Sequence, residues 1–331
     1  RVISGDFVTT EDGTGIVHTA PTFGADDAVA AKNASPEVPP MLIRNTNDEL
    51  VPLVDLQGKF VSELGTLGGK FVKNEYYEQG TAPEKSVDVE IAIKLKEENK
   101  AFRVEKYTHS YPNCWRTDKP VLYYPLNSWF VKVTDNKHNL ISNNDKINWK
   151  PKSTGEGRFG NWLNNANDWN LSRSRFWGIP LPIWISEDGS ATKVIGSVKE
   201  LISEIELSIK SGNMKSNPFD SFELDNMSDD NYDKIDLHKH IIDDIILTSS
   251  SNKKMYRESD LIDVWFDSGA MPYAQWHYPF ENKNYIDNKE FFPADYIAEG
   301  VDQTRGWFYT LHVIGTLVFD SNAYKNVISN G

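Results

Sequence analysis

Short apolar runs broken by Gly, Pro, Asn and Asp dominate the first 80 residues of the chain. Residues 15–18, 41–43 and 51–54 are such runs, and the pattern is typical of short strands joined by turns. One helix is predicted over residues 25–32, because two acidic side chains would lie in its first turn, where negative charge suits the helix dipole. This part of the chain is therefore predicted to be rich in β-structure.

The pattern changes after residue 80. Residues 87–89 could begin a strand, whereas the apolar and charged positions of residues 91–98 fit a helix better, and we favour the helix. Residues 102–124 are predicted to form strands around a turn at residues 111–114, and another strand is predicted over residues 129–133.

Residues 186–259 differ in composition from the rest, since they are rich in Asp, Ser, Asn and Lys and contain no Trp. We interpret them as an inserted, mostly exposed subdomain. One helix is predicted within it, over residues 198–209, because four apolar residues lie on or near one face of such a helix. These residues are Leu201, Ile202, Ile205 and Leu207.

Aromatic residues become frequent again from Leu261 onward. The apolar residues 296–298 predict a strand, and residues 304–319 are apolar almost throughout. A helix that is apolar on all sides is a buried helix, so residues 304–319 are predicted to cross the core.

Composition limits the class of protein. Hydrophobic residues make up 39% of the 331 residues and aromatic residues 12%, which is enough for a sizeable core in two domains. The single cysteine, Cys114, excludes a disulfide framework, and no run of about 18 apolar residues predicts a membrane helix, so we expect a cytoplasmic protein. Because the net charge is −13, any RNA partner would need a local basic patch.

The first group of residues with candidate chemistry lies at positions 13–27, which read GTGIVHTAPTFGADD. A strand next to glycines would deliver His18 to a turn, and the chain would then enter a helix that carries Asp26 and Asp27. A His and an Asp brought together in this way could hold an ammonium group and orient a water near an ester. From the residues alone, a hairpin with a satisfied His and two acidic residues at a helix start is favoured.

The second group, at positions 169–184, reads WNLSRSRFWGIPLPIW. Arg173 and Arg175 are flanked by aromatic residues, so they could contact phosphate or RNA. The alternative is a solvated basic turn beside a strand stiffened by proline, and short motifs of this kind also match by chance.

The third group joins DVWFDSG at positions 263–269 to DYIAEGVDQTRGWF at positions 295–308. In open α/β sheets, ligands bind beyond the carboxyl ends of the strands. Glu299, Asp302 and Gln303 would gather at such an end, where Gly300 allows a ligand to approach closely. Carboxylate and amide groups suit ribose hydroxyls and an ammonium group, whereas helix capping beside a core Trp is the structural alternative.

Two further groups of residues give weaker evidence of a functional site. Asp236, His238 and His240 would share one face of a strand as a metal trio, but an exposed turn in the acidic segment is favoured, and we predict no metal site. Cys114 has no second cysteine to pair with and is interpreted as part of a structural turn.

All three main groups closely resemble motifs of the class I aminoacyl-tRNA synthetases for isoleucine, valine and leucine, most specifically the isoleucyl form. The resemblance implies that Asp27 grips the α-amino group of a wrongly attached amino acid and that His18 and Thr19 line the same editing pocket. It also implies that Glu299, Gly300, Asp302 and Gln303 bind the aminoacyl-adenylate, that Trp265 and Trp307 wall the isoleucine side chain, and that Arg173 and Arg175 are candidate tRNA contacts. The threonine-rich strand of the family's editing pocket is not found in this sequence.

The resemblance further implies an α/β fold, with a β-rich editing portion followed by the second half of a Rossmann-type catalytic domain that carries an inserted subdomain. The expected domains are the C-terminal part of the editing domain (residues 1–100), a connection with an inserted module (101–185), an acidic inserted subdomain (186–259) and the second Rossmann half (260–331). The chain is expected to be an internal piece of a longer enzyme.

That enzyme is expected to activate isoleucine with ATP and Mg²⁺, to transfer it to tRNA(Ile) and to hydrolyse mischarged Val-tRNA(Ile), as a monomer without membrane contact. The family's His-Ile-Gly-His and Lys-Met-Ser-Lys-Ser signatures, which bind ATP and stabilise the transition state, do not occur in the sequence. The chain by itself is therefore predicted to bind no cofactor and to form no adenylate. The alternatives are a valyl-tRNA synthetase fragment and a non-catalytic RNA- or protein-binding module with this fold.

Overall fold

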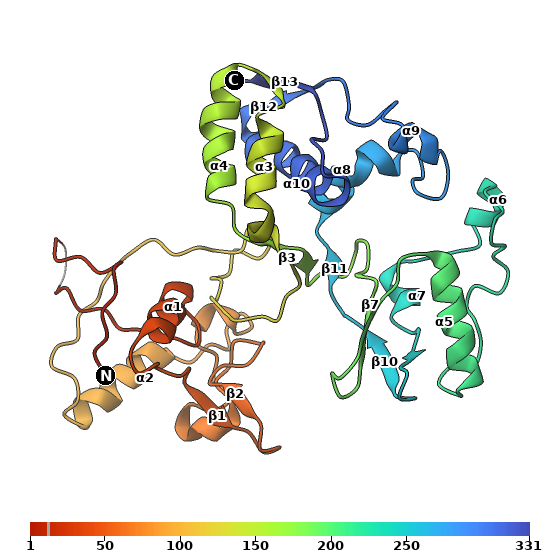
Figure 1. Cartoon of the computed structure of the whole chain (residues 1–331). Coiled ribbons are helices and arrows are strands. Elements are labelled where there is room, and N and C mark those ends of the chain that lie inside the picture. The colour runs from red at the N-terminus through yellow and green to blue at the C-terminus, as the bar shows by residue number, and fades with distance from the viewer. Residues whose placement is uncertain (12–13) are drawn as a thin grey trace. The chain divides into compact units, whose positions relative to one another are not determined.

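The computed structural model describes residues 1–11 and 14–331, which form two compact units, residues 1–127 and residues 128–331 (Figure 1). Gly13, the first residue of the first candidate motif, lies outside the described residues. The division falls between Asn127 and Ser128. The four domains expected from the family resemblance are not the same as these compact units, and their bounds stay predictions.

The first unit has short elements. They are α1 (Ala25–Asn33), β1 (Leu42–Arg44), β2 (Leu50–Pro52), the 3₁₀ turns η1 (Ser62–Leu67) and η2 (Asn74–Tyr76), and α2 (Val87–Glu97). The predicted helix at residues 25–32 is confirmed, and β1 pairs with β2 in an antiparallel hairpin. The strand expected at residues 15–18 is wrong, because that segment finds no partner strand in the described part of the chain.

A side-chain cap at Ser86 makes residues 87–97 a helix, α2, where the sequence also allowed a strand. The Ser86 side chain accepts a hydrogen bond from the Val89 backbone N–H at 3.4 Å, which begins the helix at Val87. The alternative strand at residues 87–89 is therefore wrong. The strands expected at residues 102–124 are also wrong for the residues described, since the backbone there forms one bridge, Asn113 to Pro120, and no strand.

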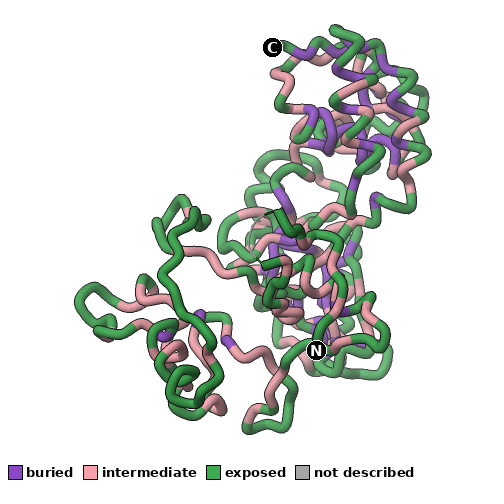
Figure 2. Tube along the Cα trace, turned by 90° about the vertical axis from the view of Figure 1, so that its left-hand side faces the viewer, coloured by how far each residue is buried: buried purple, intermediate pink, exposed green. Residues whose placement is uncertain are grey.

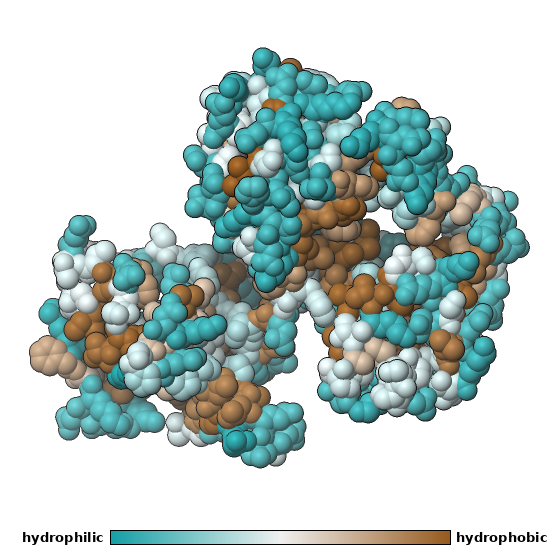
Figure 3. Space-filling view, viewed as in Figure 1, coloured by the Kyte–Doolittle hydropathy of each residue, from teal (hydrophilic) through white to brown (hydrophobic). Residues whose placement is uncertain are grey.

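The first unit buries little apolar surface. Among its described residues the buried hydrophobic side chains are Ala31, Val54 and Val87, whereas Ile16 and Leu56 are almost fully exposed. Figure 2 marks the buried residues along the whole chain in purple, and Figure 3 shows apolar patches left at the surface.

The second unit contains a core of helices and a three-stranded parallel sheet. Strand order is β12-β13-β4, and both pairings are parallel. Helix α10 packs against α8 and α3 beside this sheet, and its central residues are buried on every side (Figure 1). The elements are η3 (Val133–Asn136), α3 (Lys137–Asn144), β4 (Asn148–Lys150), the π-helical turn η4 (Thr154–Phe159), α4 (Gly160–Asn164), α8 (Val264–Ala274), α9 (Lys283–Asp287), β12 (Ile297–Gly300), η5 (Val301–Arg305), α10 (Trp307–Phe319) and β13 (Asn326–Asn330).

Two predictions for this region need adjustment. The strand predicted at residues 296–298 is formed one residue later, as β12. The single helix predicted over residues 304–319 is divided at Gly306, whose φ of −137° and ψ of −114° are not helical, so a 3₁₀ turn precedes α10.

The acidic segment forms a small subdomain with its own core. Its antiparallel sheet has the order β8-β7-β10-β9, and helix α5 packs on it. Ile205 and Leu247 are buried in this core together with Trp184 of β7, so the subdomain begins before the segment and is more than a solvated insert. The elements are β7 (Ile183–Ser186), β8 (Thr192–Val194), α5 (Val198–Lys210), α6 (Asp229–Tyr232), α7 (Lys239–Ile242), β9 (Leu247–Thr248) and β10 (Lys254–Arg257).

Helix α5 confirms the predicted helix at residues 198–209. The Ser197 hydroxyl caps the helix by accepting from the Glu200 N–H, and the Glu200 carboxylate accepts from the N–H of Gly196, the residue before the cap. Leu201, Ile202 and Ile205 are buried as predicted, but Leu207 is 51% exposed and lies off the buried face.

Short antiparallel pairs complete the second unit. They are β3 (Phe130–Val131) with β5 (Trp169–Asn170), and β6 (Ser172–Arg173) with β11 (Leu261–Ile262). The strand predicted at residues 129–133 is thus shorter than expected. No helix within residues 1–11 and 14–331 has the length and apolarity needed to cross a bilayer.

Candidate functional sites

A cavity of about 650 Å³ opens in the first unit beside the first candidate motif. His18 and Thr19 line it together with Pro21 and Met41. The His18 side chain is exposed, so an imidazole is available at the cavity wall. The structure therefore brings two of the three predicted editing residues to one cavity.

Asp27, the third residue, holds the loop next to this cavity. Its Oδ2 accepts a hydrogen bond from the Ala20 backbone N–H at 2.8 Å, which pins the turn after Thr19 onto the start of α1. A Cβ placed on Gly24 would lie 2.5 Å from the same oxygen. Gly24 is therefore required for this contact, and sequence analysis did not single it out. Asp27 itself is not among the residues that line the cavity.

In the second unit, Glu299 and Gly300 end strand β12, and Asp302 and Gln303 follow in η5. The predicted position at the carboxyl end of a parallel strand is confirmed, with Glu299 and Gly300 as the last strand residues and Asp302 and Gln303 just beyond them. Glu299 and Asp302 are exposed. Among the described residues the Glu299 carboxylate has no hydrogen-bond or ion-pair partner, so it is free to accept hydrogen bonds from a ligand.

Gln303 is held by both ends of its amide group. Its Oε1 accepts from the Trp307 backbone N–H at 2.8 Å, and its Nε2 donates to Asp302 Oδ2 at 3.1 Å. The first bond satisfies an N–H at the start of α10 that has no partner within the helix. Gly306 makes room for this arrangement, because a Cβ there would lie 2.6 Å from Gln303 Oε1.

The two tryptophans predicted to line the isoleucine site, Trp265 and Trp307, both lie next to Gly306. Trp307 follows Gly306 in the chain, and the Trp265 ring would lie 3.4 Å from a Cβ on Gly306. The Trp307 indole N–H donates to the Ser268 carbonyl oxygen of α8 at 3.2 Å, which fixes its orientation across the two helices. Trp265 is 39% exposed, so its ring is partly open to a ligand.

Arg173 is held by an acidic partner within the second unit, and its role as a tRNA contact stays a prediction. Its guanidinium lies 2.7 Å from Asp263, a buried carboxylate that also accepts from the Trp169 indole N–H at 3.0 Å. Asp263 in turn caps α8 by accepting from the Trp265 N–H. Arg173 therefore supports the helix that carries Trp265, and sequence spacing could not show this because the pair is 90 residues apart.

Asp267, also on α8, was missed by sequence analysis. Burial raises the pKa of its carboxyl group, and the nearby charge of Asp263 raises it further. Asp267 therefore lies in a partly desolvated region next to the residues that hold Trp265.

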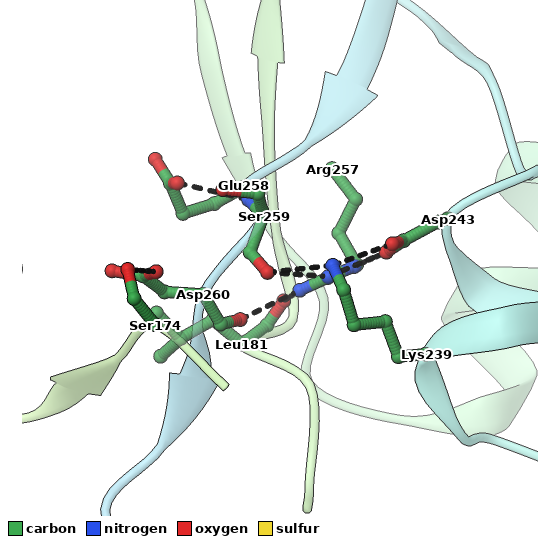
Figure 4. A network of polar contacts seen from close by, with 8 residues as sticks. All are labelled: Ser174, Leu181, Lys239, Asp243, Arg257, Glu258, Ser259 and Asp260. Carbon is green, nitrogen blue, oxygen red and sulfur yellow. Dashed lines mark hydrogen bonds and ion pairs between the residues drawn. The ribbon is translucent and has the colours of Figure 1, made fainter. Parts of the chain in front are cut away.

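A polar network joins the acidic subdomain to Ser174, which follows β6, and to Asp260, which precedes β11 (Figure 4). The Arg257 side chain is fully buried and donates to Asp243 and to the backbone carbonyls of Leu181, Ser259 and Asp260. Lys239 donates to Asp243 and to the Ser259 carbonyl, and the Ser174 hydroxyl donates to Asp260.

The residues considered as a metal trio are close together, but not on a strand. His238 is the N-cap of α7, and Asp236 contacts both His238 and His240. No three metal-ligating side chains are arranged to hold an ion in the part of the chain that the structure describes. Cys114 lies in a turn closed by the Thr117 and Asp118 N–H groups, and its pKa is lowered chiefly by the Thr117 side chain.

The class of protein to which this parallel sheet and its neighbouring residues belong follows from the similarity of the chain to known proteins. Residues 72–331 match the family model of class I tRNA synthetases (I, L, M and V), and the chain belongs to this family. Over its whole length the chain is 58% identical to an isoleucine–tRNA ligase of Bacteroides fragilis (strain YCH46), 55% to that of Porphyromonas gingivalis and 44% to that of Clostridium novyi. It corresponds to a part of such a ligase, and the valyl alternative is disfavoured.

The chain spans about 30% of the length of the Bacteroides and Porphyromonas relatives, and 27% of the Clostridium one. Among solved structures, a LeuRS–tRNA–LeuAMS ternary complex from Agrobacterium radiobacter K84 is 18% identical, with a TM-score of 0.28 over 50% of this chain and 19% of that one.

Proposed function

We propose that the protein containing this chain activates isoleucine with ATP, transfers it to tRNA(Ile) and hydrolyses Val-tRNA(Ile). The observation that carries the proposal is the 55–58% identity to isoleucine–tRNA ligases along the entire chain. In the same proposal the parallel sheet belongs to the second half of a Rossmann-type domain, the first unit contributes to an editing domain, and the enzyme acts as a cytoplasmic monomer.

The residues beyond β12 suit an aminoacyl-adenylate. Exposed carboxylates at Glu299 and Asp302 can accept hydrogen bonds from ribose hydroxyls and from an ammonium group. Gln303 is oriented by Trp307 and Asp302 before any ligand arrives, so little conformational entropy remains to be lost on binding. Trp265 and Trp307 supply apolar walls for an aliphatic side chain.

A second, hydrolytic site follows from a physical limit of the first. One methylene changes binding in an apolar pocket by only roughly 1–3 kcal/mol, a limit for which isoleucine–tRNA ligases are the standard example. We assign the correction of valine errors to the cavity lined by His18 and Thr19. Asp27 holds the loop beside this cavity with Oδ2 but does not line the cavity, so its proposed binding of the ammonium group through the other oxygen rests on the family resemblance.

ATP is a substrate in this proposal, and Mg²⁺ accompanies it. Among the described residues no three His, Cys, Asp or Glu side chains lie close enough together to hold a metal ion. The contribution proposed for this chain is to orient the adenylate and to exclude water from the apolar walls.

Isoleucine-dependent exchange of pyrophosphate into ATP by the intact protein tests the synthetic function. Glu299→Gln should lower kcat/KM for adenylate formation, whereas Glu290→Gln, an exposed carboxylate outside the site, should leave it unchanged. A protein that exchanges pyrophosphate with valine but not with isoleucine would support the valyl enzyme. A folded protein without any exchange would support a non-catalytic module.

A further inference from the structure

Two large aromatic side chains stand exposed next to each other after β6. Phe176 is 73% exposed and Trp177 is 68% exposed, and both follow Arg175, which is exposed as well. Exposed aromatic side chains beside arginine are typical of interaction sites, because each supplies a large contact area with few rotatable bonds. Neither aromatic residue has a role in the synthetic or editing sites described above.

Trp177 is held in place by a column of rings. Its indole stacks on the His238 imidazole with ring centroids 4.4 Å apart and planes at 16°. His238 is followed by His240 at 6.4 Å and 21°, so the three rings lie nearly parallel. One face of the indole is therefore covered, and its high exposure places the other face toward solvent.

Asp236 fixes the column from the side. Its Oδ1 accepts from the His238 backbone N–H at 2.8 Å and lies 2.7 Å from His238 Nδ1, while its Oδ2 lies 3.3 Å from His240 Nε2. Both imidazoles are thus oriented by one carboxylate. The indole is pre-oriented in turn, which reduces the entropy lost when a ligand stacks on it.

The backbone also directs Trp177 outward. Gly178 follows it with φ of +148°, a conformation that side chains rarely adopt, and a Cβ there would lie 3.2 Å from Leu261. The glycine therefore packs against strand β11 while the preceding indole points away from the core.

Arg175 supplies a cation that nothing else uses. Among the described residues its guanidinium has no hydrogen-bond or ion-pair partner, whereas Arg173 is paired with Asp263. The two residues Arg175 and Trp177 lie within about 7 Å of each other along the chain. In a chain with a net charge of −13, such an unpaired arginine beside an open indole is a local site for an anionic, aromatic ligand.

We propose that Trp177 and Arg175 form a stacking platform for one unpaired nucleotide of bound RNA. The base stacks on the open face of Trp177 and extends the ring column, while Arg175 contacts a phosphate of the same strand. Asp236 and His238 are positioning residues that act through Trp177. The inference rests on the proposed function, in which the RNA is tRNA.

The chain offers a matched control for Trp177. Trp115 is 79% exposed and also lies beside an arginine, but the Arg116 guanidinium covers its ring at 4.2 Å. Trp115 thus has similar size and exposure without the open, pre-oriented face. An effect of exposed indoles in general would appear in both variants, and an effect of the platform only in Trp177→Ala.

The test is equilibrium binding of tRNA(Ile) to the intact protein over a series of salt concentrations. Trp177→Ala should weaken binding by roughly 5- to 150-fold without changing the salt slope, because stacking involves no phosphate. Arg175→Ala should reduce the slope of log K against log salt by about 0.7, as expected for one lost contact to a single strand. Trp115→Ala should change neither quantity.

Two further variants test the positioning role. His238→Ala should weaken binding because the indole is no longer held, and His238→Phe should restore most of the affinity because it restores a ring to stack on. Wild-type affinity in Trp177→Ala overturns the inference and leaves the proposed function standing. If the wild-type protein activates isoleucine and both variants, Trp177→Ala and Arg175→Ala, bind tRNA(Ile) as tightly as it does, the RNA binds elsewhere. If the wild-type protein binds no tRNA(Ile), both proposals are overturned.

Discussion

Asp27 has a structural contact as well as its proposed role in editing. The hydrogen bond from the Ala20 N–H occupies Oδ2 and shapes the loop after Thr19, while the second oxygen has no partner among the described residues. Deleting the side chain would remove both the charge and the loop contact. Substitutions that separate these two functions are therefore more informative than alanine alone.

We expect Asp27→Asn to retain the loop contact, since an amide oxygen can still accept from Ala20, and to lose the charge that attracts an ammonium group. Clearance of preformed Val-tRNA(Ile) should fall by at least 10-fold while isoleucine activation is unchanged. Gly24→Ala should also slow clearance, because the added Cβ displaces the Asp27 carboxylate. Parental clearance by a folded Asp27→Asn enzyme would remove Asp27 from the ammonium site.

His312 is a buried histidine in the middle of α10. Its Nε2–H donates to the Leu140 carbonyl oxygen at 2.8 Å, and its Nδ1 has no partner within the described residues. Burial lowers the pKa of the imidazole from its ordinary value of 6.5 to about 4, although the bond to Leu140 acts in the opposite direction. The folded protein therefore resists protonation of this group more than the unfolded chain does.

Stability should consequently fall on acidification. The unfolded chain takes up the proton as the pH drops through 6.5, and the folded protein does so only near pH 4, so roughly 3 kcal/mol is lost between these values and nothing is lost above pH 7. Urea unfolding at pH 7 and pH 4.5 measures the loss. His312→Leu removes the titrating group, and an equal loss in that variant would show that other groups cause it.

Single residues also show where sequence analysis reached its limit. Glu299 and Gln303 could be placed at the end of a strand because local pattern determines that position. The ion pair of Arg173 could not be predicted, since its partner Asp263 lies 90 residues further along the chain, just after the strand that pairs with β6. Asp236, His238 and His240 were correctly grouped as neighbours, but a helix start rather than a strand brings them together.

At the scale of elements, residues at the junction between η5 and α10 both cap the helix and are proposed to bind the ligand. Gln303 caps α10 through the Trp307 N–H, and the same two residues line the proposed isoleucine site. A change in either residue therefore affects the other. Their expected effects on selectivity still differ, because one acts by shape and the other by hydrogen bonding.

We expect Trp307→Ala to weaken isoleucine far more than ATP and to narrow the preference for isoleucine over valine, since an apolar pocket selects mainly by filling space. Gln303→Ala should weaken both amino acids about equally, and Gln303→Glu, which keeps the acceptor for Trp307, should recover the helix start but not the affinity. Steady-state activation kinetics with both amino acids measure these effects. An unchanged isoleucine-to-valine ratio in Trp307→Ala would leave a core tryptophan in place of a pocket wall.

The Arg257 network predicts how firmly the acidic subdomain is attached to the strands beside it. Removing this fully buried guanidinium leaves Asp243 Oδ1 and the Leu181 carbonyl without the donor that Arg257 supplies, while Lys239 still donates to Asp243 Oδ2 and to the Ser259 carbonyl (Figure 4). Arg257→Ala should therefore destabilise the second unit by about 3–5 kcal/mol in urea unfolding. Lys253→Ala breaks the half-exposed pair with Asp188 on the same sheet and should have no measurable effect. Similar losses for both variants would contradict the assignment.

Whether an element could be predicted from sequence depended on how local its stabilising contacts are. Helix α1 follows from the acidic residues of its first turn, and α2 and α5 begin at serine caps within their own segments. Among the described residues, the segment at residues 15–18 has no partner strand and residues 102–124 form only the bridge between Asn113 and Pro120, so neither segment forms a ladder. Alternation along the chain could not reveal that missing partner.

For the molecule as a whole, the two units differ most in how much they bury. Both hydrophobic clusters, the one around α10 and the one around α5, belong to the second unit. Among the described residues of the first unit, three hydrophobic side chains are buried. Ordering the backbone costs about 1–2 kcal/mol per residue, and so small a core offsets little of that cost.

The chain as given should therefore open first within residues 1–127. In hydrogen–deuterium exchange we expect the amides of α1 and α2 to exchange by local opening within minutes, while those of α10 exchange only through opening of the second unit, because protection follows the buried contacts around each element. Limited proteolysis should likewise cleave the first unit and leave a resistant fragment that begins near Ser128.

Helix α5 provides the internal comparison for α2, because the two helices have similar length and a serine cap of the same kind. Helix α5 packs on its own core with one face, so its amides should be protected more than those of α2. Equal protection of α2 and α5 would show that the first unit is stabilised by contacts other than the apolar burial described here.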